Sequence, residues 1–227
     1  MKLIGSVQGI AAYRKPQEEY LPEAGIHPNH LWELIRTAYG FNTYPQWQPN
    51  TPPPTTTEFQ VGSFSANGHS FVINRLILTL DGDIAIATST EQANLVLDDL
   101  MRLLDENLGF RLRMGKVTKN FVSNVVVEFD KGLEEYLEPI SKVISVINGA
   151  RLRKTPFNIK RMVFGEMDIF PPATDPLVII ERSDFVIERR VGHPFEENRY
   201  FCTAPMQTGD HIRVLEQIEA IARSDRR

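Results

Sequence analysis

Arg75-Leu-Ile-Leu-Thr-Leu80, Asp81-Gly82 and Asp83-Ile-Ala-Ile-Ala-Thr88 form the stretch that decides the fold class of this chain. Two runs of apolar and β-branched residues flank an Asp-Gly pair, which supplies the positive φ angles that a two-residue hairpin turn requires. The sequence therefore predicts an antiparallel β-hairpin over residues 75–88.

Helical signals lie on both sides of this hairpin. After it, Ser89 and Gln92 form a capping-box pattern, and apolar residues then recur at helical spacing until Gly109. Before it, the pattern predicts a helix over Pro28–Tyr39, with Gly40 just past its end. Both helices present one apolar face and must pack against something else.

A segment with five prolines, residues 41–58, separates the first helix from the hairpin. Such a composition is typical of an extended, partly polyproline-like connector. We therefore predict a boundary here. The predicted units are residues 1–58, an N-terminal helix and Pro-rich arm, and residues 59–227, a main α+β domain that two subdomains, 59–120 and 121–227, could make up.

The chain after Phe121 reads as strand, helix, four strands and helix. The predicted strands cover residues 121–129, 158–170, 177–181, 185–191 and 199–203, and the predicted helices cover residues 133–147 and the segment from Thr208 onward. Hairpin-linked strands are antiparallel, and a sheet with a single apolar face needs a cover. The sequence therefore predicts an α+β fold with helices packed on one face of an antiparallel sheet. This order of elements resembles that of helix-grip and TATA-binding-protein-like folds.

One pattern occurs twice, as Gly109-Phe-Arg-Leu-Arg113 and as Gly149-Ala-Arg-Leu-Arg153. An internal duplication would produce such an echo. A helix C-cap followed by an amphipathic strand produces the same string without any duplication. The sequence leaves both interpretations open.

The composition excludes several classes of protein. The chain has 227 residues, 42% of them hydrophobic and 24% charged, with a net charge of −4. It can bury a core, which excludes disordered, collagen-like and cysteine-rich chains. Its single cysteine and the lack of an apolar run of the roughly 20 residues that cross a bilayer predict a cytoplasmic protein without a membrane partner.

Histidine and cysteine positions offer little catalytic or metal-binding chemistry. His27 and His30 are spaced to face one ion, but Pro28 places His27 at or before the helix start, and a surface role is the simpler interpretation. His211 follows Cys202 by nine residues, so a Cys-His pair is conceivable. The competing interpretation makes Cys202 a small buried hydrophobic residue. We expect no metal and no cofactor.

Two arginine pairs could grip phosphate groups. Arg111 with Arg113, and Arg151 with Arg153, each present two guanidinium groups on one side of a predicted strand. Lysine and arginine also protect sheet edges against aggregation, and the net charge gives nucleic-acid binding no general support. Nucleic-acid binding through these pairs is the weaker alternative.

Charges of both signs mark the predicted strands near the C-terminus. A ligand surface floored by Glu188, Arg190, Arg199 and Tyr200 is one hypothesis for them. Structural cross-strand pairs are the simpler interpretation.

Aromatic residues of the Pro-rich arm, Tyr44 and Trp47, suit the anchoring of an interface. No nucleophile, base and orienting group can be placed together, whereas residues typical of interfaces are plentiful. The sequence therefore favours a non-catalytic binding or assembly module of an intracellular complex, which acts through a protein partner or through self-association as a homo-oligomer.

The alternative is an enzyme, a hydrolase or transferase. It would use His211 with Cys202, or the Glu188 and Arg190 group.

Overall fold

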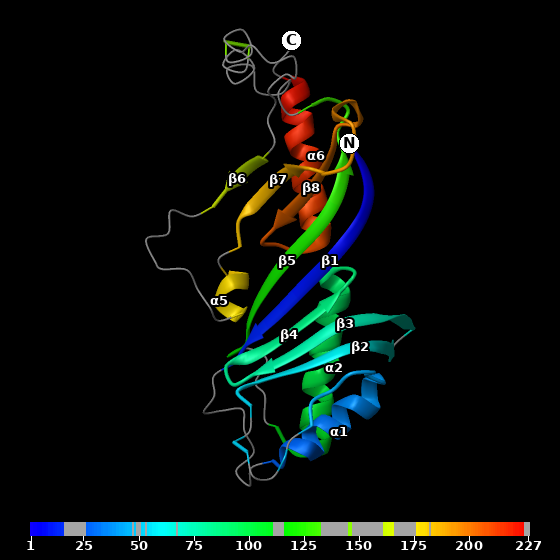
Figure 1. The fold of residues 1–227 in the computed structure, drawn as a ribbon, viewed down its shortest axis with the longest axis vertical. Coiled ribbons are helices and arrows are strands. Elements are labelled where there is room, and N and C mark those ends of the chain that lie inside the picture. Colours follow the sequence, from blue (N-terminus) through cyan, green and yellow to red (C-terminus); the bar gives the residue numbers. More distant parts are fainter. Residues whose placement is uncertain are drawn as a thin grey trace.

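Eight strands and four α-helices make up the described part of the chain (Figure 1). The computed structural model describes residues 1–15, 26–46, 48, 51–52, 54–66, 68–110, 116–132, 145–146, 161–165, 176–181 and 183–224. The strands are β1 (Lys2–Arg14), β2 (Thr56–Ala66), β3 (His69–Thr79), β4 (Gly82–Ala87), β5 (Thr118–Glu128), β6 (Arg161–Phe164), β7 (Phe185–Arg189) and β8 (Arg199–Ala204). The helices are α1 (Pro28–Tyr39), α2 (Thr90–Leu108), α5 (Pro176–Glu181) and α6 (Thr208–Ser224), and a 3₁₀ turn, η3, spans Phe195–Glu197.

All eight strands belong to one antiparallel sheet with the order β2-β3-β4-β1-β5-β8-β7-β6. Outward from its centre, β1 is followed by β4, β3 and β2, and β5 is followed by β8, β7 and β6. A long helix follows β4 and another follows β8. The sheet therefore consists of two equivalent halves, which we call the first half-sheet (β1 to β4) and the second half-sheet (β5 to β8).

The two half-sheets also match in strand register. Gly9 pairs with Ala87 in the first half-sheet, Ser123 pairs with Ala204 in the second, and the next five pairs along the strands match in turn. Gly9 and Ser123 also pair with each other. A pseudo-two-fold axis therefore passes through the Gly9 and Ser123 pair, and the chain contains an internal structural repeat.

This repeat is not the echo seen in the sequence. Equivalent residues lie 114 apart between β1 and β5 and 117 apart between β4 and β8, whereas the two copies of the echo lie 40 apart. Except for Gly109 and Phe110, the echo also lies outside the described residues.

The three longer helices cover one face of the sheet, and α5 lies on the other. Buried residues of α1 and α2 pack with Ala11 and Tyr13 of β1. Leu215 of α6 packs with Val125, whose side chain lies on the same face as that of Ala11. The residues of the α5 contact belong to the opposite face. They are Leu177 and Ile180 of α5 with Ala12, Ile77, Ile84, Ile86 and Val122 of the strands.

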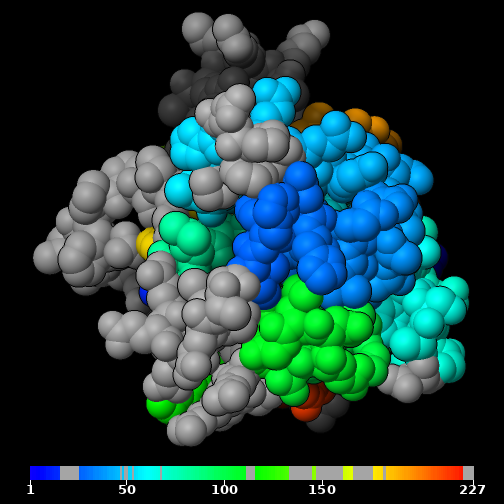
Figure 2. All heavy atoms as spheres, turned by 90° about the horizontal axis from the view of Figure 1, so that it is seen from below, coloured from blue at the N-terminus to red at the C-terminus, as the bar shows by residue number. Residues whose placement is uncertain are grey.

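The hairpin and the ends of α2 are confirmed, but the predicted turn was wrong. β3 and β4 pair antiparallel with Leu78 opposite Asp83, Gly82 is the first residue of β4, and neither Asp81 nor Gly82 has a positive φ. The Ser89 hydroxyl accepts a hydrogen bond from the Gln92 N–H at 3.3 Å at the start of α2, and Gly109 ends that helix with φ 69°. Seen from below, α1 (blue) lies beside the green residues of α2 (Figure 2), and the Tyr39 hydroxyl donates to Asp99 of α2 at 3.0 Å.

The prediction of a strand over residues 177–181 was wrong, because this segment lies in α5. A run of five residues is too short for hydrophobic periodicity to separate a strand from a helix. Pro176 is the first residue of α5, a position where the missing N–H costs nothing and the fixed φ suits a helix.

The sequence pattern missed β1. Gly5 and Gly9 interrupt its alternation, and register shifts occur on both sides of the Gly5 and Ser6 positions. β1 nevertheless lies in the centre of the sheet. β1, which lies in the segment predicted as residues 1–58, thus pairs with β4 and β5. The helix predicted over residues 133–147 lies outside the described residues, apart from residues 145–146.

The two long helices begin at the pseudo-two-fold axis and cap one another. The Thr90 N–H donates to the Thr208 hydroxyl oxygen at 3.1 Å, and the Thr208 N–H donates to the Thr90 hydroxyl oxygen at 2.7 Å. The Gly209 N–H donates to the Glu91 carboxylate at 3.1 Å. Each hydroxyl therefore accepts a first-turn N–H of the other helix, which has no partner within its own helix.

Replacing Gly9 with alanine tests how closely α2 approaches the sheet. A Cβ atom at Gly9 would lie 1.9 Å from the carbonyl carbon of Ser89 and 2.0 Å from the nitrogen of Thr90. We expect Gly9→Ala to lower the free energy of unfolding by about 3 kcal/mol, since backbone must move to make room. The measurement is urea unfolding. Gly5→Ala is the matched control on the same strand, with no atom within 4 Å of its Cβ; equal effects of the two variants would contradict the prediction.

The reciprocal caps predict non-additive mutations. Thr90→Val and Thr208→Val should each lower the free energy of unfolding by about 1 to 2 kcal/mol, because each removes the acceptor of a buried N–H. The double variant should lose less than the sum of the two, since both changes act on one shared network. Thr56→Val, at an exposed position of β2, is the control. Additive losses in urea unfolding would show that the two helix starts do not depend on each other.

Candidate functional site

Cys202 and His211 are both buried on the helix-covered side of the sheet. Burial raises the pKa of the Cys202 thiol to about 12, so the thiolate needed for nucleophilic chemistry is not formed near neutral pH. Burial lowers the pKa of His211 to about 4. The imidazole packs edge-on against Phe185 with ring centroids 5.6 Å apart, and an interaction with the Ser123 backbone opposes the effect of burial on the pKa.

The internal repeat explains the burial of these two residues. Cys202 of β8 corresponds to Ala85 of β4 in the strand register. His211 stands three residues after Thr208 in α6, as Ala93 stands three residues after Thr90 in α2. Ala85 and Ala93 are core residues of the first half. Cys202 and His211 therefore occupy core positions between helix and sheet, and the structure shows no hydrogen bond between them.

A buried ion pair links the end of β1 to β4. Lys15, just after β1, pairs with Asp83 of β4, and both side chains are almost completely buried. Desolvation raises the pKa of Asp83 and lowers that of Lys15, while the attraction between the two charges opposes both shifts. This ion pair holds β1 against β4. Because both side chains are buried, the pair is not accessible to a ligand.

Metal-ligand geometry is not found in the described part of the chain. His27 and His30 are exposed at the start of α1. Among the described residues, no group of three or more His, Cys, Asp or Glu side chains is placed to hold a metal ion. In the same residues, no helix is both long and apolar enough to span a bilayer.

The four residues proposed as the floor of a ligand surface do not all lie on one face of the sheet. Glu188 and Arg199 lie on the face opposite α6, and exposed Arg190 extends the same ladder by donating its N–H to the Arg199 carbonyl at 3.0 Å. Tyr200 points the other way, into the core, with its ring 5.4 Å from that of Phe129. Arg199 contacts Glu128 at 3.4 Å, so part of this charge is already paired.

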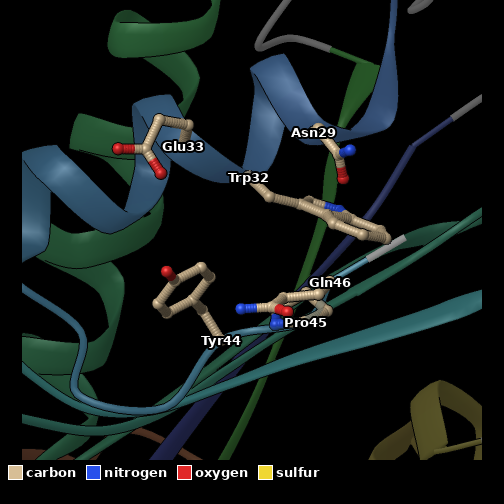
Figure 3. Close-up of a pocket in the computed structure, with 6 residues that line it drawn as sticks. All are labelled: Asn29, Trp32, Glu33, Tyr44, Pro45 and Gln46. Carbon is tan, nitrogen blue, oxygen red and sulfur yellow. The ribbon is translucent and has the colours of Figure 1, made fainter. Parts of the chain in front are cut away.

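Five of the candidate residues lie outside the described residues. They are Trp47 of the arm and the arginine pairs Arg111 with Arg113 and Arg151 with Arg153. Tyr44 is described, and it lines a pocket of about 230 Å³ between α1 and the segment that follows it. The lining residues, drawn in Figure 3, are Asn29, Trp32, Glu33, Tyr44, Pro45 and Gln46.

Most of the side chains around the pocket beside α1 already contact one another. In Figure 3, Trp32 projects from α1 toward the segment that carries Tyr44, but the indole is only 4% exposed. Arg36 binds Glu33 with two hydrogen bonds, and its guanidinium lies 5.2 Å from the centre of the Tyr44 ring. These aromatic contacts mainly hold the segment that carries Tyr44 against α1. The sequence pattern had singled out Tyr44 but not Trp32, whose helical spacing marks it as a core residue.

The face of the second half-sheet opposite α6 is the counterpart of the surface under α5. The register matches Ile84 with Phe201, Ile86 with Thr203, Ala12 with Val126, Ile77 with Glu188, Ile10 with Asn124 and Val122 with Gln8. We call the six counterpart residues the open patch: Gln8 of β1, with Asn124, Val126, Glu188, Phe201 and Thr203 of the second half-sheet. None of the described helices packs on it.

Polar side chains of the open patch form a short chain of hydrogen bonds. The Thr203 hydroxyl donates to Asn124 at 2.8 Å, and the Asn124 amide donates to Gln8 at 3.2 Å. Glu188 lies beside them and is 48% exposed, with Arg161 of β6 at 3.8 Å. The patch therefore combines a small apolar centre with polar groups and one accessible carboxylate.

The two edges of the sheet differ in their protection. At β2, Thr43 forms a bridge with Gln60, and the Asn42 N–H donates to the carbonyl of Val61, whose φ of 51° interrupts a regular edge. At β6, the described residues provide pairing only on the β7 side. Val163 and Phe164 of β6 are 47% and 55% exposed. The β2 edge is thus partly covered at Gln60 and Val61, whereas β6 presents two half-exposed apolar side chains.

No protein-family model matches the sequence, and no curated protein matches it either. The functional argument therefore depends on the surfaces described above.

His211 makes the stability of the fold dependent on pH. An unfolded histidine titrates near pH 6.5, whereas the pKa of folded His211 is about 4. Because the unfolded chain takes up this proton first, the free energy of unfolding falls as pH decreases from about 6.5 toward 4, by at most about 1.4 kcal/mol per pH unit. We expect His211→Ala to lose less stability than wild type between about pH 7 and pH 5 in urea unfolding.

The control for this prediction is His69→Ala. His69 is exposed at the start of β3, so its removal should leave the pH dependence of unfolding as in the wild type. Identical pH dependence in His211→Ala and wild type would show that His211 is not held uncharged in the folded state.

Proposed function

We propose that this chain is a non-catalytic assembly module that binds a second copy of itself through the outer edge of β6. The observation that carries the proposal is the contrast between the two sheet edges. Residues 42–43 and the conformation of Val61 protect the middle of the β2 edge. β6 presents Val163 and Phe164, which are about half exposed, and among the described residues nothing pairs with its outer edge. An edge of this kind invites pairing with another strand.

A symmetric pair of β6 strands has a favourable register. In an antiparallel pair about a two-fold axis, directly opposite residues share a face of the sheet, so the axis passes through a residue paired with its own copy. An axis at Val163 pairs the two valines and places Met162 opposite Phe164 of the copy. Apolar cross-strand pairs then stand on both faces. An axis at Arg161 would instead place two arginines opposite each other, which is unfavourable.

Burial of the reactive groups favours assembly over catalysis. Cys202 and His211 fill core positions, and on the second half-sheet Glu188 pairs with Arg161 and Arg199 pairs with Glu128. Nucleic-acid binding depends on arginines outside the described residues and stays a prediction. The finer comparison with helix-grip and TATA-binding-protein-like folds also stays a prediction.

Light scattering after size exclusion tests the assembly. At micromolar concentration, wild type is expected to have twice the 25.9 kDa mass of one chain. Val163→Lys, and separately Val163→Glu, should weaken self-association at least about tenfold, because each places like charges opposite each other at the axis. An equimolar mixture of the two variants should regain the dimer mass, since opposite charges then meet.

Val72→Lys serves as the matched control. Val72 is 54% exposed on β3, an interior strand, and its variant should remain dimeric. A wild-type chain that stays monomeric throughout the micromolar range contradicts the proposal. A dimer that tolerates Val163→Lys contradicts the choice of β6 as the interface.

A further inference from the structure

Gly165 follows β6 directly, and a residue next to β7 fills the place of its missing side chain. A Cβ atom at Gly165 would lie 3.0 Å from Cγ of Asp184 and closer still to its Oδ1. The register of β6 and β7 pairs Phe164 with Phe185. Gly165 and Asp184 are the next two residues along these strands, so they face each other. Asp184 therefore reaches over β6 and places a carboxylate where the side chain of residue 165 would stand.

Arg161 stands at the other end of β6 on the same face of the sheet. Residues 161, 163 and 165 share this face, because side chains alternate along a strand. Arg161 is exposed, and its guanidinium lies 3.8 Å from the carboxylate of Glu188. Asp184 is also exposed, and no ion pair joins it to another of the described residues. One end of this face of β6 thus carries an accessible cation, and the other end carries an accessible carboxylate.

A symmetric β6 pair brings these two ends together. With the two-fold axis at Val163, Arg161 of one chain lies opposite Gly165 of the copy, and the reverse contact follows by symmetry. Directly opposite Cβ positions are about 5 Å apart in an antiparallel pair. Because the Asp184 carboxylate fills the side-chain position of Gly165, the long side chain of Arg161 from the copy can reach it.

We infer that Arg161 and Asp184 form two reciprocal ion pairs across the β6 pair and thereby select a second copy of this chain as the partner. This inference rests on the proposed β6 dimer. Each arginine then stands between two carboxylates, Glu188 of its own chain and Asp184 of the copy. Only an axis at Val163 places residue 161 opposite Gly165, so the two pairs also fix the register. A strand without this charge pattern gains only the apolar contacts.

Charge reversal tests the two ion pairs by sedimentation equilibrium of the full chain. Arg161→Glu should repel Asp184 of its copy at both ends of the pair, and Asp184→Arg should repel Arg161 in the same way. Each variant should raise the dimer dissociation constant at least about fivefold, because two favourable pairs become two repulsive ones. An equimolar mixture of the two variants should return to within about twofold of wild type, since opposite charges then meet at both ends. This recovery would also show that both variants are folded.

The double variant Arg161→Glu with Asp184→Arg tests the choice of partner. It should dimerise with itself, because its charges are exchanged and remain complementary. It should pair poorly with wild type, since both contacts would then join like charges. Native mass spectrometry of a mixture with isotope-labelled wild type should therefore find fewer mixed dimers than random pairing gives. Arg213→Glu, at an exposed arginine of α6, is the matched control and should mix freely with wild type.

Failure of this inference can be told apart from failure of the proposed dimer. A wild-type chain that stays monomeric removes both. A wild-type dimer that Val163→Lys disrupts, but that Arg161→Glu and Asp184→Arg leave unchanged, keeps the β6 edge as the interface and overturns the ion pairs. Random pairing of the double variant with wild type would overturn them as well.

Discussion

The first residues of α2 and α6 meet above Gly9, and the rest of the structure depends on this contact. A side chain at Gly9 would collide with the backbone of Ser89 and Thr90, so only glycine lets α2 begin directly over the centre of the sheet. Thr90 and Thr208 then cap each other's helix. This arrangement fixes the two half-sheets relative to one another, because each long helix is held by its own half-sheet and by the start of the other helix.

Equivalent positions of the two halves differ in chemical character according to the face they occupy. On the helix-covered face, both halves remain apolar: Ala85 corresponds to Cys202, and both are buried in the core. On the opposite face, the first half is apolar beneath α5, whereas Glu188, Thr203 and Asn124 make the second half polar. Positions under a helix are apolar, because burying a polar or charged side chain costs free energy. Positions that no described helix covers can carry charge, because water solvates it.

Part of the candidate site followed from strand alternation, and part of it did not. Alternation places Glu188 and Arg190 on one side of β7 and its continuation, as the structure does. Arg199 and Tyr200 are neighbours in one strand, and neighbours point to opposite faces, so the two could not share one floor. The decisive feature of the open patch is that its counterpart holds α5. No short-range pattern carries that information, because the equivalent residues are more than 100 positions apart and differ in chemical character.

The sequence by itself determined that β3 and β4 form a hairpin, though not which residues make its turn, and it determined the start and end of α2, the extent of α1 and the α+β class. These depend on turn and capping chemistry within a few consecutive residues, which acts before any tertiary contact exists. Only the tertiary structure decided the central place of β1, the helical state of α5, the order of the strands and the faces that remain accessible. Each of these depends on pairing or burial between distant segments, which can override a weak local pattern such as the glycine-interrupted alternation of β1 or the five-residue apolar run of α5.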